Sequence, residues 1–132
     1  MDMEINFPGG KRVDSLVRGF TVKTDQSKED GGENTAPSPF ELFLASIGTC
    51  AGIYALNFCQ KRHIDTDNLK IGLEFQKNSK TNMVERICID VKLPPSFPAK
   101  YKPALIKSIG LCSVKKHLET PPQVQIIADV RT

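Results

Sequence analysis

Alternating apolar and polar residues predict short strands in several parts of the chain. Residues 3–24 carry short apolar stretches around Gly9-Gly10, which predicts a β-hairpin, with a second strand pair through residues 19–22. Residues 69–75 and 87–93 alternate more strictly and predict two strands joined by a turn at residues 78–82. Residues 124–130 alternate in the same way and predict a last strand.

A continuous apolar run between the first and second groups of strands predicts a long helix. Ser38 suits the N-cap, Pro39 the first helical position and Glu41 the third, which together form a capping box. Lys61 or Arg62 suits the C-terminal end. Because the middle of this helix is apolar on nearly every side, we expect it to be buried all round. Polar residues dilute it, so we interpret it as a core helix and expect no membrane span.

The remaining segments complete a mixed α+β order of elements. Residues 103–118 predict a second helix that Gly110 breaks or bends and that Pro121-Pro122 ends. Residues 25–37 are polar and predict a surface loop, long enough to be functional or mobile. The order is hairpin, long helix, two strands, helix and strand, in a single domain over residues 1–132.

The composition argues against several classes of function. Hydrophobic residues make up 39% and charged residues 25%, as in ordinary soluble proteins. The net charge of +3 is spread along the chain without a basic run, which argues against nucleic-acid binding. The N-terminus carries acidic residues and no apolar signal-peptide core, so we expect a cytoplasmic protein. The cysteines form no C-x-x-C pair and the histidines lie far from them, so no metal site is expected.

The four cysteines differ in their sequence surroundings. Cys50 lies in the long helix among small residues, which let another backbone or a ligand approach closely, or simply suit a packed helix crossing. Cys59 is about 13 Å further along the same helix, too far to bond Cys50, and is interpreted as structural. Cys88 falls on the polar face of its strand, and we assign it no role. Cys112 either completes the apolar face of the second helix or, if Gly110 restarts that helix, lies near an N-terminus that favours a thiolate.

Two segments resemble the cysteine motifs of one known family. Residues 37–50, Pro-Ser-Pro-Phe-Glu-Leu-Phe-Leu-Ala-Ser-Ile-Gly-Thr-Cys, resemble the first-cysteine helix of the OsmC/Ohr proteins. Residues 112–118, Cys-Ser-Val-Lys-Lys-His-Leu, resemble their second-cysteine motif. The Gly9-Gly10 hairpin and the order of elements also fit, so the resemblance covers nearly the whole chain.

The resemblance implies a fold, a partner and a reaction. It implies an intertwined homodimer with the long helices at its centre, and a peroxidatic Cys50 resolved by Cys112. In peroxidase members, a Glu before the helix and an Arg in the N-terminal hairpin orient the thiolate. The Glu position falls on Phe40, and Glu41 is one residue off with a capping role. For the cation, Arg12 follows Gly9-Gly10 most closely, and Arg18 and Lys11 are the alternatives.

The chemistry implied by the resemblance is thiol-dependent reduction of organic hydroperoxides. Cys50 is oxidised to a sulfenic acid, Cys112 condenses with it to a disulfide, and an external dithiol reduces the disulfide. No metal or organic cofactor is required. An apolar pocket with Phe40 or Tyr54 would favour alkyl hydroperoxides. Two alternatives remain: a non-catalytic stress-response or ligand-binding module on the same scaffold, and another thiol chemistry such as disulfide exchange.

Overall fold

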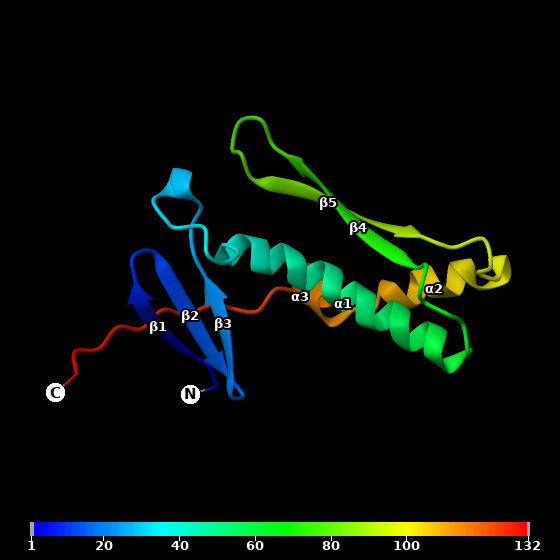
Figure 1. Ribbon diagram of the computed structural model, residues 1–132, viewed down its shortest axis with the longest axis horizontal. Helices are drawn as coiled ribbons and strands as arrows, with labels where there is room; N and C mark the ends of the chain where they lie inside the picture. Colours follow the sequence, from blue (N-terminus) through cyan, green and yellow to red (C-terminus); the bar gives the residue numbers. More distant parts are fainter. Residues whose placement is uncertain (1, 132) are drawn as a thin grey trace. The chain divides into compact units, whose positions relative to one another are not determined.

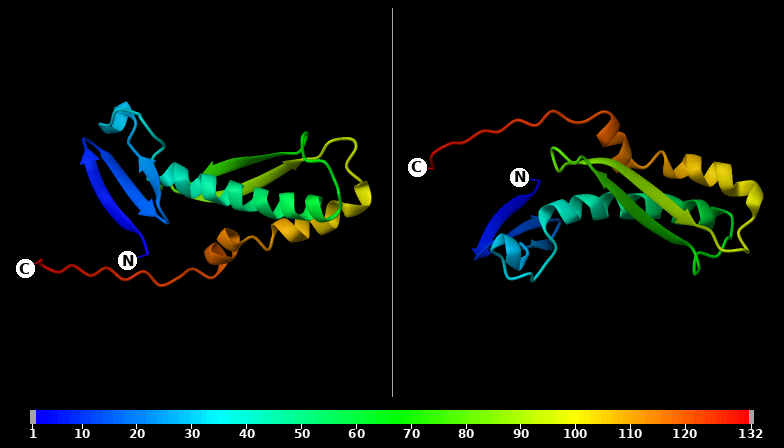
Figure 2. Two further views of the ribbon diagram at one scale, coloured as in Figure 1. Left: turned by 60° about the horizontal axis from the view of Figure 1, so that its bottom comes forward. Right: turned by 90° about the horizontal axis from the view of Figure 1, so that it is seen from above.

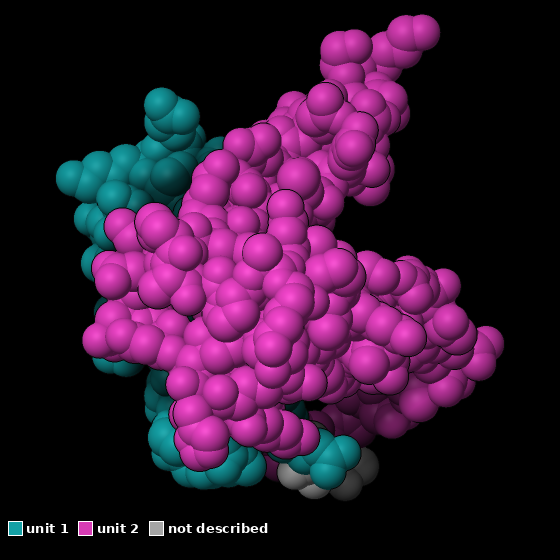
Figure 3. Space-filling model, turned by 90° about the vertical axis from the view of Figure 1, so that its right-hand side faces the viewer, with its two compact units in different colours: residues 1–46 teal, residues 47–132 magenta. Residues whose placement is uncertain are grey.

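The computed structural model describes residues 2–131 and divides into two compact units, residues 1–46 and 47–132 (Figures 1 and 3). Three strands, a long helix, two strands and two short helices follow one another along the chain in an α+β fold. The long helix α1 (Pro39–Lys61) begins in the first unit and continues into the second. We call the two parts the N-terminal unit and the C-terminal unit.

The N-terminal unit is built on a three-stranded antiparallel sheet. Its order is β1 (Glu4–Gly9), β2 (Arg12–Val17) and β3 (Phe20–Thr24). Gly10 and Gly19 have φ values of 59° and 82°, and Arg18 has a φ of 48°, so positive-φ residues make both tight turns. The predicted hairpin and second strand pair are therefore confirmed.

Hydrogen bonds to a buried carboxylate order the loop after β3. Asp25 is 1% exposed, and its carboxylate accepts bonds from Gln26 N at 2.7 Å, Thr35 N at 3.1 Å and Thr35 Oγ1 at 2.7 Å. These bonds, the Thr35 hydroxyl first, lower the pKa of Asp25 from 3.8 to about 2. A short 3-10 turn, Lys28–Asp30, lies within this loop.

The capping box of α1 forms as predicted. Ser38 N donates to Glu41 Oε1 at 3.0 Å, and Glu41 N donates to Ser38 Oγ at 3.2 Å. These bonds satisfy two of the N–H groups that the start of a helix leaves unpaired. They also lower the pKa of Glu41.

The C-terminal unit packs a β-hairpin and two short helices around α1. Strands β4 (Lys70–Lys77) and β5 (Val84–Lys92) pair antiparallel, and the hairpin runs along α1 (Figure 1). Helix α2 (Lys102–Ile109) follows the 3-10 turn Ala99–Tyr101, and α3 (Ser113–Glu119) follows α2. The apolar core joins α1 to α2 and the loop before it; its buried members are Ala51, Ala55, Phe58, Cys59, Phe97, Leu105 and Ile109.

A glycine permits close packing between α1 and the hairpin. A Cβ added at Gly48 would lie 2.9 Å from Leu73 Cδ1, which is inside normal van der Waals contact. By contrast, no atom lies within 4 Å of a Cβ added at Gly52. The small residues around Cys50 therefore serve helix–strand packing on one side and leave open space on another.

The structure confirms one sequence prediction in this unit and corrects another. The predicted break at Gly110 is confirmed, because α2 ends at Ile109 with Gly110 as its C-cap and Cys112 is extended (φ −58°, ψ 140°) before α3. One chain alone leaves Ile53 of α1 47% exposed, so the expected burial of α1 on every side would need a partner chain. The predicted last strand is an extended segment without a pairing strand (Figure 2), and Val124, Ile126 and Val130 are each more than 80% exposed.

Helix α1 is the one helix in residues 2–131 that is long and apolar enough to cross a membrane by length and composition. A core helix of a soluble protein passes the same test. Five of its residues, Ile47, Ala51, Ala55, Phe58 and Cys59, are buried within this chain. That burial favours the core-helix interpretation.

Candidate functional site

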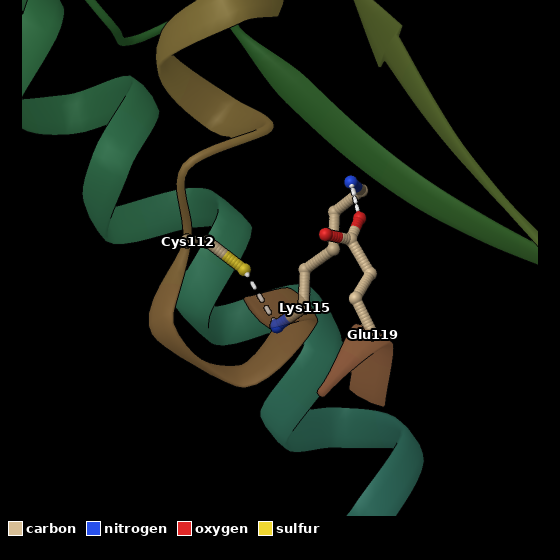
Figure 4. Close-up of polar contacts among 3 residues, drawn as sticks. All are labelled: Cys112, Lys115 and Glu119. Atoms are coloured by element: carbon tan, nitrogen blue, oxygen red, sulfur yellow. Dashed lines mark hydrogen bonds and ion pairs between the residues drawn. The ribbon is translucent and has the colours of Figure 1, made fainter. Parts of the chain in front are cut away.

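Cys112 lies at the N-terminus of α3, one of the two positions that the sequence allowed. It is the N-cap residue, and its Sγ accepts a hydrogen bond from Lys115 N at 3.3 Å (Figure 4). Lys115 also forms an ion pair with Glu119 one turn later. Helix α2 ends at Ile109 with Gly110 as its C-cap, and the backbone is extended at Cys112.

Burial outweighs the helix terminus in setting the charge of Cys112. The side chain is 0% exposed, and this burial raises the pKa of its thiol, while the N–H of Lys115 lowers it to a smaller extent. The N–H groups at the start of α3 lower the pKa of Cys112, as expected of a helix N-terminus, but burial raises it by more. Cys112 is a protonated thiol at neutral pH.

The structure brings Cys50 and Cys112 together. Cys50 is half-buried on α1 and lies close enough to Cys112 that its side chain raises the pKa of the Cys112 thiol. Both cysteines are free thiols. A cysteine of α1 and the N-cap cysteine of α3 are therefore near each other, as a reversible disulfide would require.

The other two cysteines lie in different surroundings. Cys59 is 0% exposed in the core, and burial raises the pKa of its thiol, partly offset by the nearby charge of Arg62. Cys88 is exposed on β5 and lies opposite Glu74 of β4. The sequence predicted that Cys88 lies on the polar face of its strand. Neither residue shares the helix-terminal setting of Cys112.

The two predicted substrate-binding residues lie in different units. Phe40 is 53% exposed at the start of α1 and packs edge-on against Phe43 with ring centroids 5.6 Å apart. Tyr54 is half-buried and lines a cavity between α1 and α2. It follows Cys50 by one helical turn and so lies on the same side of α1.

The three candidate cations belong to the N-terminal unit. Arg12 is exposed, and its Nε donates to Gly9 O at 3.3 Å across the turn between β1 and β2. Arg18 stacks over the Phe20 ring, with its guanidinium carbon 5.1 Å from the ring centroid. Lys11 is exposed in the same turn as Gly10.

Sequence reasoning missed an apolar cavity beside the second cysteine. Its walls come from β5 and α2, its volume is about 320 Å³, and Lys115 also lines it; the apolar lining is Ile89, Val91, Ile106 and Ile109. The alternation of β5 indicated that Ile89 and Val91 point inward. It did not indicate that the space between them and α2 stays open.

No group of three or more His, Cys, Asp and Glu side chains is arranged to hold a metal ion within residues 2–131.

Comparison with known protein families and solved structures gives several matches. The family model described as OsmC-like protein matches residues 31–127. A structure from Psychrobacter arcticus 273-4, of an inferred osmotic stress induced and detoxification response protein, superposes with a TM-score of 0.73 at 16% identity, covering 88% of this chain and 86% of that one. No curated protein sequence matches.

Two further solved structures share the fold. A hypothetical protein from Aquifex aeolicus VF5 gives a TM-score of 0.63 at 22% identity, covering 90% of this chain and 86% of that one. The organic hydroperoxide resistance protein OsmC from Legionella pneumophila, a predicted redox protein, gives 0.55 at 15% identity, covering 88% and 86%. At these identities the likeness shows the fold.

Proposed function

Because this chain belongs to the family of OsmC-like proteins, we propose that it reduces organic hydroperoxides, with Cys50 as the peroxidatic thiol and Cys112 as the resolving thiol. The observation that carries the proposal is the proximity of these two side chains, since Cys50 raises the pKa of Cys112. The Legionella pneumophila protein of the same fold is an organic hydroperoxide resistance protein, which supports this chemistry.

The proposed cycle needs only the two thiols, a hydroperoxide and a dithiol. The Cys50 thiolate attacks the distal peroxide oxygen, the O–O bond breaks, and the alkoxide leaves as an alcohol after taking a proton. Cys112 then attacks the Cys50 sulfenic acid, the S–O bond breaks, and water leaves as the disulfide forms. An external dithiol reduces this disulfide by exchange and is itself oxidised.

The setting of Cys112 suits a resolving role. Its raised pKa keeps the proton on Cys112, so it does not compete as a thiolate with Cys50 for peroxide. The apolar cavity lined by Ile89, Val91 and Ile106 is also lined by Lys115, whose backbone N–H donates to Cys112 Sγ. Such a cavity would accept an alkyl group more readily than water or hydrogen peroxide.

A cation from the N-terminal hairpin is part of the proposal. A thiol reacts as its thiolate, and a nearby guanidinium favours that form. We assign this role to Arg12, with Arg18 and Lys11 as the alternatives. We assign Glu41 no part in activating Cys50, because its carboxylate accepts a hydrogen bond from Ser38 N in the capping box.

One observation favours the non-catalytic alternative. Peroxidase members of the family are expected to place a Glu where this chain has Phe40, and Phe40 is half-exposed with only Phe43 as an aromatic partner. A binding module on the same scaffold would keep the cysteines as packing residues and show no turnover.

We also propose that the protein is a cytoplasmic homodimer. Ile53 on α1 and the apolar tail residues Val124, Ile126 and Val130 are all exposed in one chain, and exposed apolar surface of this kind marks an interface. Four free thiols suit a reducing compartment. Sedimentation at micromolar concentration should give a dimer, and a monomer would contradict this part of the proposal.

Turnover with single-cysteine variants tests the proposed reaction. Wild-type protein should consume cumene hydroperoxide with dithiothreitol as reductant faster than dithiothreitol alone. Cys50→Ser should abolish this catalysis, Cys112→Ser should stop after one turnover with a trapped sulfenic acid, and Cys59→Ser should retain turnover if it folds. A wild-type rate no higher than that of dithiothreitol alone would overturn the proposal in favour of a non-catalytic module.

A further inference from the structure

A second cavity lies between the C-terminal half of α1 and α2. Its volume is about 450 Å³, within the range of small-molecule sites. Phe58, Ala104 and Leu111 give it apolar walls, and Tyr54, Asn57 and Ser108 add neutral polar groups. All of these residues belong to the C-terminal unit.

The charged side chains that line this cavity are all positive. Lys61, Arg62 and Lys107 line it, and no Asp or Glu does. The two ion pairs that the structure contains within residues 2–131 involve Lys92 and Lys115, so none of the three cations in the cavity is neutralised by a carboxylate. Three cations within one cavity attract an anion and repel a cation.

Arg62 is held in place by its neighbours. One of its guanidinium nitrogens, Nη1, donates to Phe58 O at 3.1 Å, and the guanidinium carbon lies 3.6 Å from the centroid of the Phe58 ring. The Tyr101 ring lies on the same group at 5.6 Å. A guanidinium has five N–H donors in a fixed plane, so stacking orients the remaining donors before any ligand arrives.

Helix ends alone do not account for the arrangement. Lys61 is in the last turn of α1 and Lys107 in the last turn of α2, where cations complement the helix dipole. That effect explains a cation on each helix but not their convergence. Here the cations of two helices share one cavity with hydroxyl and amide groups and an apolar wall.

We propose that this cavity binds a small organic anion, with its acidic head on Lys61, Arg62 and Lys107 and its apolar body against Phe58 and Leu111. The charged donors would hold the head, and the apolar wall would exclude polar ions of similar charge. Binding here requires no redox chemistry. It therefore stands or falls separately from the function of the cysteines.

Equilibrium titration of the full chain tests the inference with two probes of similar shape. The probes are 2-naphthoate, which is anionic, and 2-naphthalenemethanol, which is neutral. Isothermal titration should show one naphthoate bound per chain, about tenfold or more tighter than the alcohol. Equal affinities, or no naphthoate binding, would overturn the proposal.

Two variants at one position distinguish this cavity from other apolar surfaces. Ala104 is exposed on α2 and lines the cavity, so Ala104→Glu adds a carboxylate there, while Ala104→Gln adds a neutral side chain of the same size. Ala104→Glu should weaken naphthoate about tenfold or more relative to Ala104→Gln. Equal binding by the two variants, with both shown to be folded by circular dichroism, would place the probe elsewhere and overturn the assignment.

Discussion

The two compact units are stabilised in different ways. Every buried hydrophobic residue within residues 2–131 lies in the C-terminal unit, where Leu105 and Cys112 are almost or fully buried. The N-terminal unit instead buries Thr24 and Asp25, and leaves Phe20 58% exposed. The contrast shows why the thiol pair lies where it does: only the packed unit can hold two side chains from different helices in fixed contact.

The largest expected effect is on the packed unit. Leu105→Ala should lower the free energy of unfolding by about 2–5 kcal/mol, because it removes a fully buried side chain and leaves a cavity. Phe20→Ala in the exposed face of the sheet should change it by about 0.5 kcal/mol or less. Urea unfolding at low protein concentration measures both. Equal losses would show that the two units are not stabilised differently.

The next largest effect is expected on the reactivity of Cys50, which we propose that Arg12 raises. Arg12→Ala should slow alkylation of Cys50 by iodoacetamide roughly tenfold at neutral pH and move its pH profile upward, because a cation favours the thiolate. Arg12→Lys should restore only part of the rate, since an ammonium lacks the planar fork of a guanidinium. Superimposable profiles for wild type and Arg12→Ala would reject Arg12 and direct the same test to Arg18 and Lys11.

A smaller loss is expected where α1 begins. Ser38→Ala removes the cap that Glu41 N binds and should cost about 1 kcal/mol of unfolding free energy. Glu41→Gln should preserve the capping box and leave the alkylation profile of Cys50 unchanged. A changed profile in Glu41→Gln would mean that this carboxylate acts on the thiol after all.

The smallest expected effect is electrostatic and appears only at acidic pH. Asp25 has a folded-state pKa of about 2, below its ordinary 3.8, so the stability that it contributes is present above pH 4 and lost as the pH falls through about 2. Wild-type unfolding free energy should therefore fall across this interval more steeply than that of Asp25→Asn. Parallel curves would show that the hydrogen bonds of the loop do not depend on the charge of Asp25.

The sequence predicted local structure well and long-range arrangement less well. The capping box at Ser38 and Glu41 and the hairpin at Gly9-Gly10 follow from spacing within a few residues, and the structure confirms both. Residues 124–130 have the alternation of a strand, but pairing depends on a neighbour that the pattern does not specify. The same limit applies to α1, because its apolar pattern does not specify what would cover Ile53, which one chain leaves exposed.

The candidate site shows the same division. Cys50 and Cys112 were selected from motifs, and in the structure they are close enough for Cys50 to raise the pKa of Cys112. The sequence could not predict their surroundings, since the pKa of Cys112 depends on how completely the neighbouring helices exclude water. The cationic cavity was equally hidden, because Arg62 and Lys107 come together only when α1 packs against α2.

The central claim is that Cys50 and Cys112 act as a redox pair, and disulfide mapping tests it most directly. Reduced protein is treated with a substoichiometric amount of cumene hydroperoxide, blocked with iodoacetamide and digested for mass spectrometry. We expect one intramolecular disulfide, joining the peptides of Cys50 and Cys112, with Cys59 and Cys88 recovered as thiols. Four unchanged thiols, or a disulfide that contains Cys59 or Cys88, would contradict it.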